Sequence, residues 1–400
     1  MAEITIRQIH DQEIVDIFHW FPSYAFRSTP PLPDKAEEAE KIKGRGGVRY
    51  FALFEESAPM ACGAITPLTQ NVRGRLFPCY GVFDIVTHPA ARRKGYARRL
   101  MIRLLEAIHE DDRPLSTLYP FRESFYERLG YISFPFQRTV RFSPTDLLPL
   151  LKQDLGGTVE LKMIGEGIPE YIGFMRSLRA EVHGLELFDY PNISGLQQNR
   201  NWLALAKVDG EVVGLMVYQL KENRSPSILP ARFLMSVLRF YYLTSQGRYL
   251  LLEWLARHAD QANQIELLSL PPYEFPETWV ADLKLTPDLF FLAPMGRVVD
   301  VAGIAGMSTG PGKFTARIRD PYCPWNEGSW TFETEDGKLA VRQAPLAENE
   351  LSIQGLSALI YGSHAPADFA YRGWGRPSAE LQATLQIMFP PKIPYLHEYF

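Results

Sequence analysis

The sequence predicts an α+β protein that contains one strand–turn–helix arrangement twice and ends in a smaller mixed unit. The stretch 83–109 reads as a strand, a basic turn with glycine and an amphipathic helix. Residues 201–261 repeat the order of 49–109, with two strands around a polar turn and then strand, turn and helix. Residues 314–343 alternate apolar and polar positions around turn signals, as paired antiparallel strands do.

Length and composition limit the class of protein. A chain of 400 residues is expected to form two or three domains, which we place at 1–150, 151–288 and 289–400. No apolar run reaches the roughly 20 residues of a membrane helix, and residues 1–15 lack the apolar centre of a secretory signal. The three cysteines are too scattered for a disulfide framework or a zinc site, so we expect a cytoplasmic protein with no metal. The net charge of −4 argues against a nucleic-acid partner.

The first expected elements are a strand and two helices. Residues 4–9 alternate as a strand does. Asp11 can cap a helix that runs through Trp20. Asp34 begins a polar helix, and Gly44 ends it.

The stretch between these helices is rich in proline and aromatic residues. Rings in such a loop either pack on the core, which is the more frequent case, or line a substrate cleft. Tyr24 and Phe26 are our candidates for the cleft.

The rest of the first unit is expected to be a sheet with one long and one short helix. Leu100, Leu104 and Ile108 share one face of the long helix, and Gly130 ends the short one. The expected strands are 49–55, 60–68, 77–87 and 116–119, with one or two more in 131–142, and the expected helices begin at Tyr96 and span 123–129.

The turn between the strand and the long helix suits a diphosphate. Gly95 and the small Ala97 let the backbone approach an anion closely, and the first amides of a helix favour negative charge. A basic, solvated helix start is the alternative. The positive charges of the turn come from Arg92, Arg93, Lys94 and Arg98.

A second motif, 118–131, joins a strand to a short helix that carries Tyr126. A phenol with a pKa of about 10 can act as a general acid and give a proton to a leaving group. The alternative is that Tyr126 only packs on an amphipathic helix. The basic turn upstream favours the role of general acid over packing.

The second repeat lacks these features. Its turn, 244–248, holds one basic residue, and no counterpart of the Tyr126 motif follows. We expect a second copy of the fold without a cofactor, in which His258 is structural. Residues 289–301 lead to the last unit, whose helices at 351–362 and 378–389 either pack in its core, as we expect, or line a lipid pocket.

The pattern Arg92-x-x-Gly95-x-Ala97 resembles the signature of the GCN5-related N-acetyltransferases (GNAT), and the motif around Tyr126 is similar to that family too. The last unit resembles a sterol-carrier-protein-like module. Together they resemble the Eis (enhanced intracellular survival) acetyltransferases, with an active GNAT fold, a degenerate second one and the C-terminal module. Ala97 departs from the glycine that relatives often have.

The resemblance implies acetyl-CoA as co-substrate and a homo-hexamer as the assembly. Tyr126 would be the general acid, and the α-carboxylate of Phe400 the general base. An α-carboxyl has a pKa of about 3.3–3.7, so we expect proton removal through water or a pKa raised by apolar burial. A frayed chain end is the alternative. The coenzyme-binding residues implied are Ile85, Val86, Thr87, Arg92, Arg93, Lys94, Gly95, Tyr96, Ala97, Arg98, Phe121 and Arg122.

The expected activity is acetyl transfer to a primary amine of a cationic small molecule, either a polyamine or an aminoglycoside-like compound. Some members of the family acetylate aminoglycosides, which is why we expect this acceptor class. Two alternatives stay open: a protein lysine acetyltransferase, and a sensor that binds coenzyme A or lipid without catalysis.

Overall fold

The computed structural model describes residues 3–222, 233–289 and 293–400. Its contacts divide the chain into two compact units. The first unit combines Met1–Phe134, Val182–Asn192 and Leu292–Phe400, and the second combines Pro135–Glu181 with Ile193–Phe291. The domain ranges expected from the sequence stay a prediction, and residues 290–292 of the expected transition lie outside the described part.

The N-terminal part of the first unit is an eight-stranded sheet with the order β1-β2-β3-β4-β5-β15-β6, with β9 paired to β3. The strands β4 and β5 are parallel, and the other neighbours are antiparallel. The predicted strands of this region are confirmed. The bounds are β1 (Ile4–Ile9), β2 (Arg49–Glu55), β3 (Ala58–Val72), β4 (Arg75–Thr87), β5 (Leu115–Leu118), β6 (Ile132–Ser133), β9 (Glu186–Phe188) and β15 (Met295–Val298).

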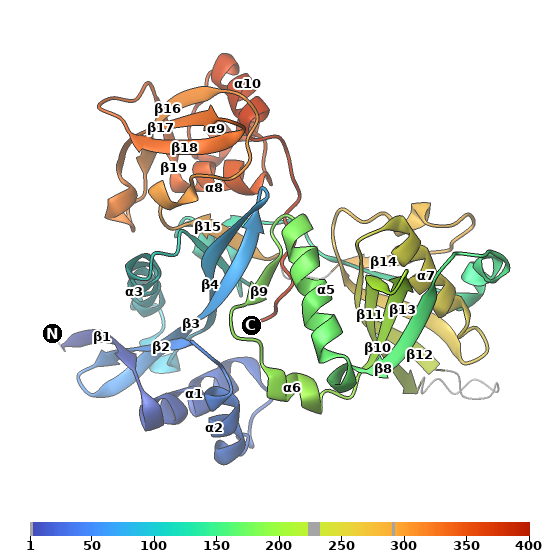
Figure 1. The fold of residues 1–400 in the computed structure, drawn as a ribbon. Helices are drawn as coiled ribbons and strands as arrows, with labels where there is room; N and C mark the ends of the chain where they lie inside the picture. The colour runs from blue at the N-terminus through green and yellow to red at the C-terminus, as the bar shows by residue number, and fades with distance from the viewer. Residues whose placement is uncertain (1–2, 223–232, 290–292) are drawn as a thin grey trace. The chain divides into compact units, whose positions relative to one another are not determined.

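Helices cover both faces of this sheet (Figure 1). Phe51 and Leu53 of β2 share a core with α3 (Tyr96–Glu110), whereas Tyr50 and Ala52 face α1 (Asp11–Phe26). This alternation follows from the two-residue repeat of a strand. The polar helix α2 (Lys35–Lys43) begins after Asp34, whose side chain accepts from two backbone amides, as predicted.

The helix α1 runs six residues beyond its expected end at Trp20 and contains Pro22. The expectation of a loop from residue 21 was therefore wrong. Pro22 is buried, and Phe21 packs in the core against the sheet. That packing outweighs the backbone hydrogen bond that the proline removes.

The central strands of the second unit are arranged as in the N-terminal sheet of the first unit. Its sheet has the order β14-β7-β13-β12-β11-β10-β8, and β12 is antiparallel to β11 but parallel to β13. The region 131–142 divides between the sheets, since β6 belongs to the first and β7 to the second. The bounds are β7 (Arg138–Phe142), β8 (Thr158–Met163), β10 (Trp202–Val208), β11 (Glu211–Glu222), β12 (Phe233–Tyr242), β13 (Ala262–Leu270), β14 (Thr286–Leu289), α5 (Ile168–Glu181), α6 (Ile193–Gln198) and α7 (Ser245–Ala256).

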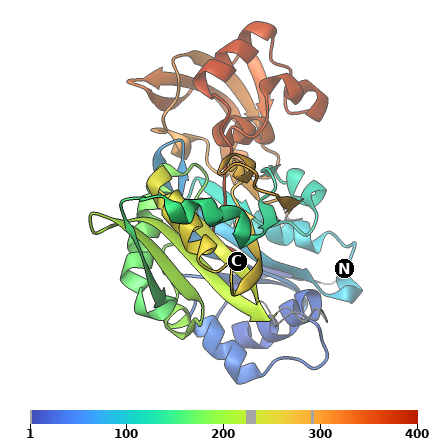
Figure 2. The ribbon, with the colours of Figure 1, turned by 90° about the vertical axis from the view of Figure 1, so that its right-hand side faces the viewer.

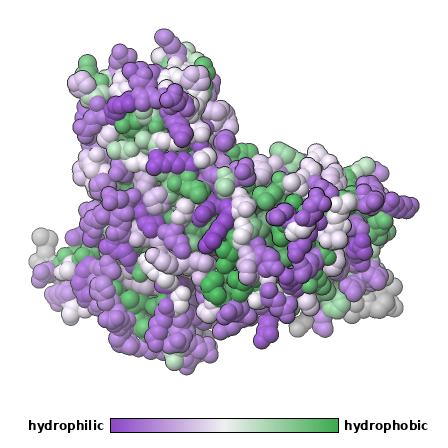
Figure 3. Space-filling view, in the orientation of Figure 1, coloured by the Kyte–Doolittle hydropathy of each residue, from purple (hydrophilic) through white to green (hydrophobic). Residues whose placement is uncertain are grey.

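The C-terminal part of the first unit is a four-stranded sheet with helices (Figure 2). Phe314, Phe332 and Leu385 lie in one buried cluster, so its helices pack in a core, and the surface over β16–β19 in Figure 3 is mostly hydrophilic. None of the described helices is both long and apolar enough to cross a membrane. The bounds are β16 (Lys313–Arg319), β17 (Gly328–Glu335), β18 (Lys338–Gln343), β19 (Asn349–Ser352), α8 (Ile353–Tyr361), α9 (Phe369–Arg372) and α10 (Ala379–Met388).

Candidate active site

The strands β4 and β5 separate partway along their length. Their pairing runs from Cys79 to Val82 on β4, and beyond Val82 the strand pairs with β3 alone. A bulge opposite Gly63 marks this point, and Asp84 there adopts a positive φ of 53°. The backbone edge of 83–87 that faces away from β3 is therefore available to an extended ligand, and it includes Ile85, Val86 and Thr87.

The turn after β4 leads into a helix whose first amides are open. Gly95 is the N-cap of α3 at a φ of 80°, a conformation that favours glycine, and it makes no side-chain cap. The first amides of a helix carry partial positive charge and need acceptors. An anionic ligand is the natural acceptor at this end of α3.

A cavity of about 420 Å³ lies at this helix end. Tyr322 of the C-terminal part forms one wall, so residues far apart in the chain close the site. Seven lining residues were predicted from the sequence: Thr87, Arg92, Arg93, Gly95, Tyr96, Ala97 and Arg98. Five were not: Ala91, Phe125, Arg128, Leu129 and Tyr322.

The charge of this cavity is strongly positive. Four of its lining residues are arginines: Arg92, Arg93, Arg98 and Arg128. Lys94, also predicted, is absent from the lining, and its ammonium lies 3.0 Å from a carboxylate oxygen of Glu55 on β2. The cavity can hold a diphosphate by charge and by helix amides together.

Tyr126 lies on the short helix α4 (Glu123–Glu127) and is buried. The rings of Phe121, Phe125 and Tyr131 surround it edge-on, with centroids 5.0–6.1 Å away. Burial raises the pKa of Tyr126 well above its ordinary value, so the phenol stays protonated at neutral pH. Phe121 and Arg122 are exposed at the start of this helix.

The chain end returns to the same sheet (Figure 1). The ring of Phe400 occupies the space that a side chain at Gly81 of β4 would fill, and it lies 6.0 Å from the ring of Tyr119. The fully buried carboxylate of Glu186 on β9 accepts hydrogen bonds from the amides of His397, at 3.3 Å, and Glu398, at 3.0 Å. The segment is anchored next to the point where β4 and β5 separate.

A second, smaller cavity of about 130 Å³ lies beside the chain end. Tyr24 and Phe26, predicted for a substrate cleft, are exposed on α1 and line neither cavity. Tyr24 instead stacks on Trp20, which stacks on His88 at the end of β4. The smaller cavity is lined by Gly44, Arg45, Gly46, Val48, Thr66, Phe83, Phe188, Tyr190, Asn192, Tyr399 and Phe400.

The corresponding helix end in the second unit is closed by its own side chains. Only residues 243 and 244 separate β12 from α7, and the hydroxyl of Thr244 accepts from the amide of Gly247. The hydroxyl of Tyr242 donates to Glu274 at 2.7 Å, and Arg248 of the first helical turn lies against the Tyr242 ring. A carboxylate of the chain thus contacts Tyr242, the last residue of β12 before this helix start. His258 bonds the carbonyl of Trp254 one helical turn earlier, a structural contact.

The described residues include no cluster of side chains suited to a metal ion. Residues 5–133 match the acetyltransferase (GNAT) domain family, and residues 305–397 match the sterol carrier protein domain family. No curated protein matches the chain.

Solved structures match over the full length of both chains. A GCN5-related N-acetyltransferase from Anabaena variabilis superposes with a TM-score of 0.83 at 17% identity. A protein of unknown function from Enterococcus faecalis, described as a probable N-acyltransferase, superposes with a TM-score of 0.81 at 20% identity. Eis1 from Mycobacterium abscessus superposes with a TM-score of 0.77 at 18% identity. These similarities confirm the predicted fold of two GNAT units and a sterol-carrier-like module.

Proposed function

We propose that this protein, an acyltransferase with an N-terminal GNAT domain and the tandem fold of Eis1, transfers the acetyl group of acetyl-CoA to a primary amine of a small molecule by direct attack. One observation carries the proposal: the arginine-lined cavity at the open start of α3 adjoins the unpaired edge of β4. A diphosphate in the cavity would let the extended arm of the coenzyme follow residues 85–87 toward Tyr126.

The transfer needs one proton removed and one supplied. The amine nitrogen forms a bond to the acetyl carbon, and the carbon–sulfur bond breaks with its electron pair on sulfur. The Tyr126 phenol gives its proton to that sulfur. A water held by the α-carboxylate of Phe400 takes the proton from the attacking nitrogen, since a carboxylate alone is a weak match for an ammonium.

A covalent acyl-enzyme is disfavoured by the state of the thiols. All three cysteines are buried. Burial raises the pKa of Cys62 well above its ordinary value and that of Cys323 to about 12, so neither supplies a thiolate nucleophile at neutral pH.

The acceptor and the assembly are open to experiment. The resemblance to the Eis family implies a polycationic acceptor and a homo-hexamer, and both stay proposals for this chain. A protein lysine acetyltransferase would modify a folded protein in an assay in which small amines stay unchanged. Retention of a long apolar ligand without acetyl transfer would favour the sensor instead.

The experiment compares substitutions of two cationic residues in the same turn. Arg98→Gln should weaken acetyl-CoA binding about tenfold in calorimetry, because hydrogen bonds to charged groups contribute about 1.5–3 kcal/mol. Lys94→Gln, which removes a cation paired with Glu55 outside the cavity, should leave binding near that of the unmodified protein.

Turnover is measured as thiol release with polyamines, aminoglycosides, aryl amines and lysine peptides. No release with any amine, or equal binding losses in the two variants, would contradict the proposal.

A further inference from the structure

One wall of the arginine-lined cavity at the start of α3 comes from the C-terminal part of the first unit. Tyr322, three residues after the end of β16, is half-buried and lines the cavity together with Phe125 and Arg128 from the region of α4. The cavity measures about 420 Å³, within the roughly 300–1,000 Å³ of pockets that hold a whole small-molecule ligand. It therefore has room for more of a ligand than a diphosphate.

The segment that carries Tyr322 is fixed by a buried ion pair. A guanidinium nitrogen of Arg297 on β15 lies 2.6 Å from a carboxylate oxygen of Asp320, and both side chains are excluded from solvent. The side-chain amide of Asn326 donates to the same oxygen of Asp320, at 3.0 Å, and to the carbonyl of Val299, at 2.8 Å. Since breaking these contacts would leave buried charges and donors without partners, they hold the segment 320–326 in place.

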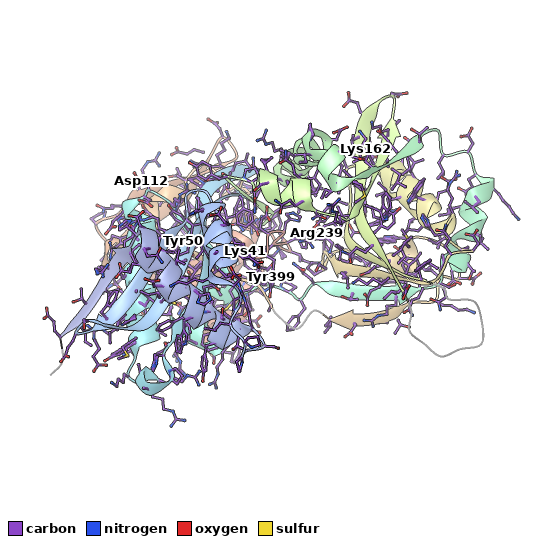
Figure 4. The ribbon with its side chains drawn as sticks, turned by 90° about the horizontal axis from the view of Figure 1, so that it is seen from below. Lys41, Tyr50, Asp112, Lys162, Arg239 and Tyr399 are labelled. Carbon is purple, nitrogen blue, oxygen red and sulfur yellow. The ribbon has the colours of Figure 1, made fainter. Side chains whose placement is uncertain are left out.

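The same segment packs against α3 as far as the last turn of this helix. The ring of Trp325 stacks on His109 near the end of α3, with centroids 4.3 Å apart. Asp112, which follows this helix end, is labelled in Figure 4. Tyr322 and Trp325 both pack against the core that α3 shares with β2. The Tyr322 ring is therefore placed in the cavity wall in advance, which reduces the ordering cost when a ligand binds.

The Tyr322 ring differs from the other rings of the lining because it is not already engaged. The ammonium of Lys94 lies 5.7 Å from the centre of the Tyr96 ring, and Phe125 packs edge-on against Tyr126 at 5.0 Å. The Tyr322 side chain forms neither a hydrogen bond nor a ring contact with any residue that the structure describes. A planar ligand group can therefore reach this ring without displacing a contact of the protein.

Acetyl-CoA has three parts in a fixed order: the thioester arm, the diphosphate and the adenosine with its 3′-phosphate. The proposed function assigns the arm to the edge of residues 85–87 and the diphosphate to the start of α3. The adenosine then meets the rest of the lining, where Tyr322 supplies a planar ring and Arg128 a cation. Aromatic side chains stack on nucleic-acid bases, and arginine pairs with phosphate.

We propose that the Tyr322 ring binds the adenine of acetyl-CoA by stacking, which makes the sterol-carrier-like part a component of the coenzyme site. The inference rests on the proposed function and assigns a residue of residues 305–397 to coenzyme recognition. A donor that lacks the nucleotide cannot reach Tyr322 and gains no affinity from it. The ring thus selects a nucleotide-bearing thioester over a short one.

The experiment measures CoA affinity by calorimetry and donor selection by thiol release. Tyr322→Ala should weaken CoA binding about tenfold, as the loss of a ring that stacks on a base does. Tyr322→Phe retains the ring and should recover most of that affinity. In turnover, Tyr322→Ala should lower kcat/KM about tenfold with acetyl-CoA, but not with S-acetylpantetheine, which has no nucleotide. The control is Tyr371→Ala, a tyrosine of the C-terminal part that is 92% exposed and outside the cavity, and it should change neither readout.

Unchanged CoA affinity in Tyr322→Ala, an equal loss in Tyr322→Phe, or equal losses with both donors would overturn the inference while acetyl transfer itself stands. If the alanine variant does not fold, Tyr322→Leu keeps apolar bulk against the core and should weaken CoA binding in the same direction. If the unmodified protein acetylates no amine, the proposed function fails, and the calorimetry still decides the role of Tyr322. If CoA itself does not bind, both fail.

Discussion

Tyr126 shows how burial sets the chemistry of one side chain. The surrounding rings remove water from the phenol and keep it protonated, as the proposed donation of a proton to a leaving thiolate requires. The same burial makes a free tyrosinate costly. Proton donation to the sulfur and reprotonation of the phenol are therefore expected to be closely coupled.

Tyr126→Phe should lower kcat by about 10²- to 10³-fold, the usual contribution of a positioned general acid. The ring fills the same space, so the fold and acetyl-CoA affinity should persist. Thiol-release kinetics and calorimetry measure the two effects. The matched control is Tyr131→Phe, which removes a neighbouring hydroxyl bonded to Ser116. A similar loss of kcat in both variants would indicate that Tyr126 contributes through packing and would contradict its role as proton donor.

At the scale of elements, sequence pattern predicted most of what local chemistry determines. Asp34 caps its helix, Gly95 begins α3 in the left-handed conformation, and residues 92–98 line the cavity apart from Lys94. Phe125 precedes Tyr126 on α4, and Arg128 and Leu129 follow directly after that helix, so their closeness to Tyr126 in the sequence could have indicated them. Tyr322, Phe188 and Glu186 had no local signal, because only the folding of distant segments onto the first sheet brings them to the site.

The two helix starts lead to a prediction about stoichiometry. The first amides of α3, after Gly95, have no side-chain cap. At α7, by contrast, the Thr244 side chain caps the helix, and the hydroxyl of Tyr242 donates to Glu274. Calorimetry should therefore find one acetyl-CoA per chain. Thr244→Ala should cost about 1 kcal/mol in the free energy of unfolding, as the loss of a cap does, and leave the stoichiometry at one. Two sites per chain would show that the second unit still binds the coenzyme.

At the scale of the whole molecule, the C-terminal part completes the N-terminal site. The strand β15 lies between β5 and β6, Tyr322 lines the arginine-rich cavity at the start of α3, and the chain end packs against β4. The resemblance to the Eis family implied a role for the chain end at the active site, whereas the last residues taken alone also fit a frayed tail. The contact depends on the absence of a side chain at Gly81, which gives the Phe400 ring its place.

The proposed role of the chain end leads to the last prediction. Glu186 holds the amides of residues 397 and 398, so it positions Phe400 without touching the substrate. Glu186→Gln retains one carbonyl acceptor and should lower kcat about tenfold, whereas adding two glycines after Phe400 moves the carboxylate and should lower kcat by about 10²-fold or more. The affinity for acetyl-CoA should be unchanged in both variants, because the proposed coenzyme cavity lies at the start of α3 and not at the chain end. The control adds two glycines before Ile4, and unchanged kcat in the C-terminally extended protein would exclude the carboxylate as the base.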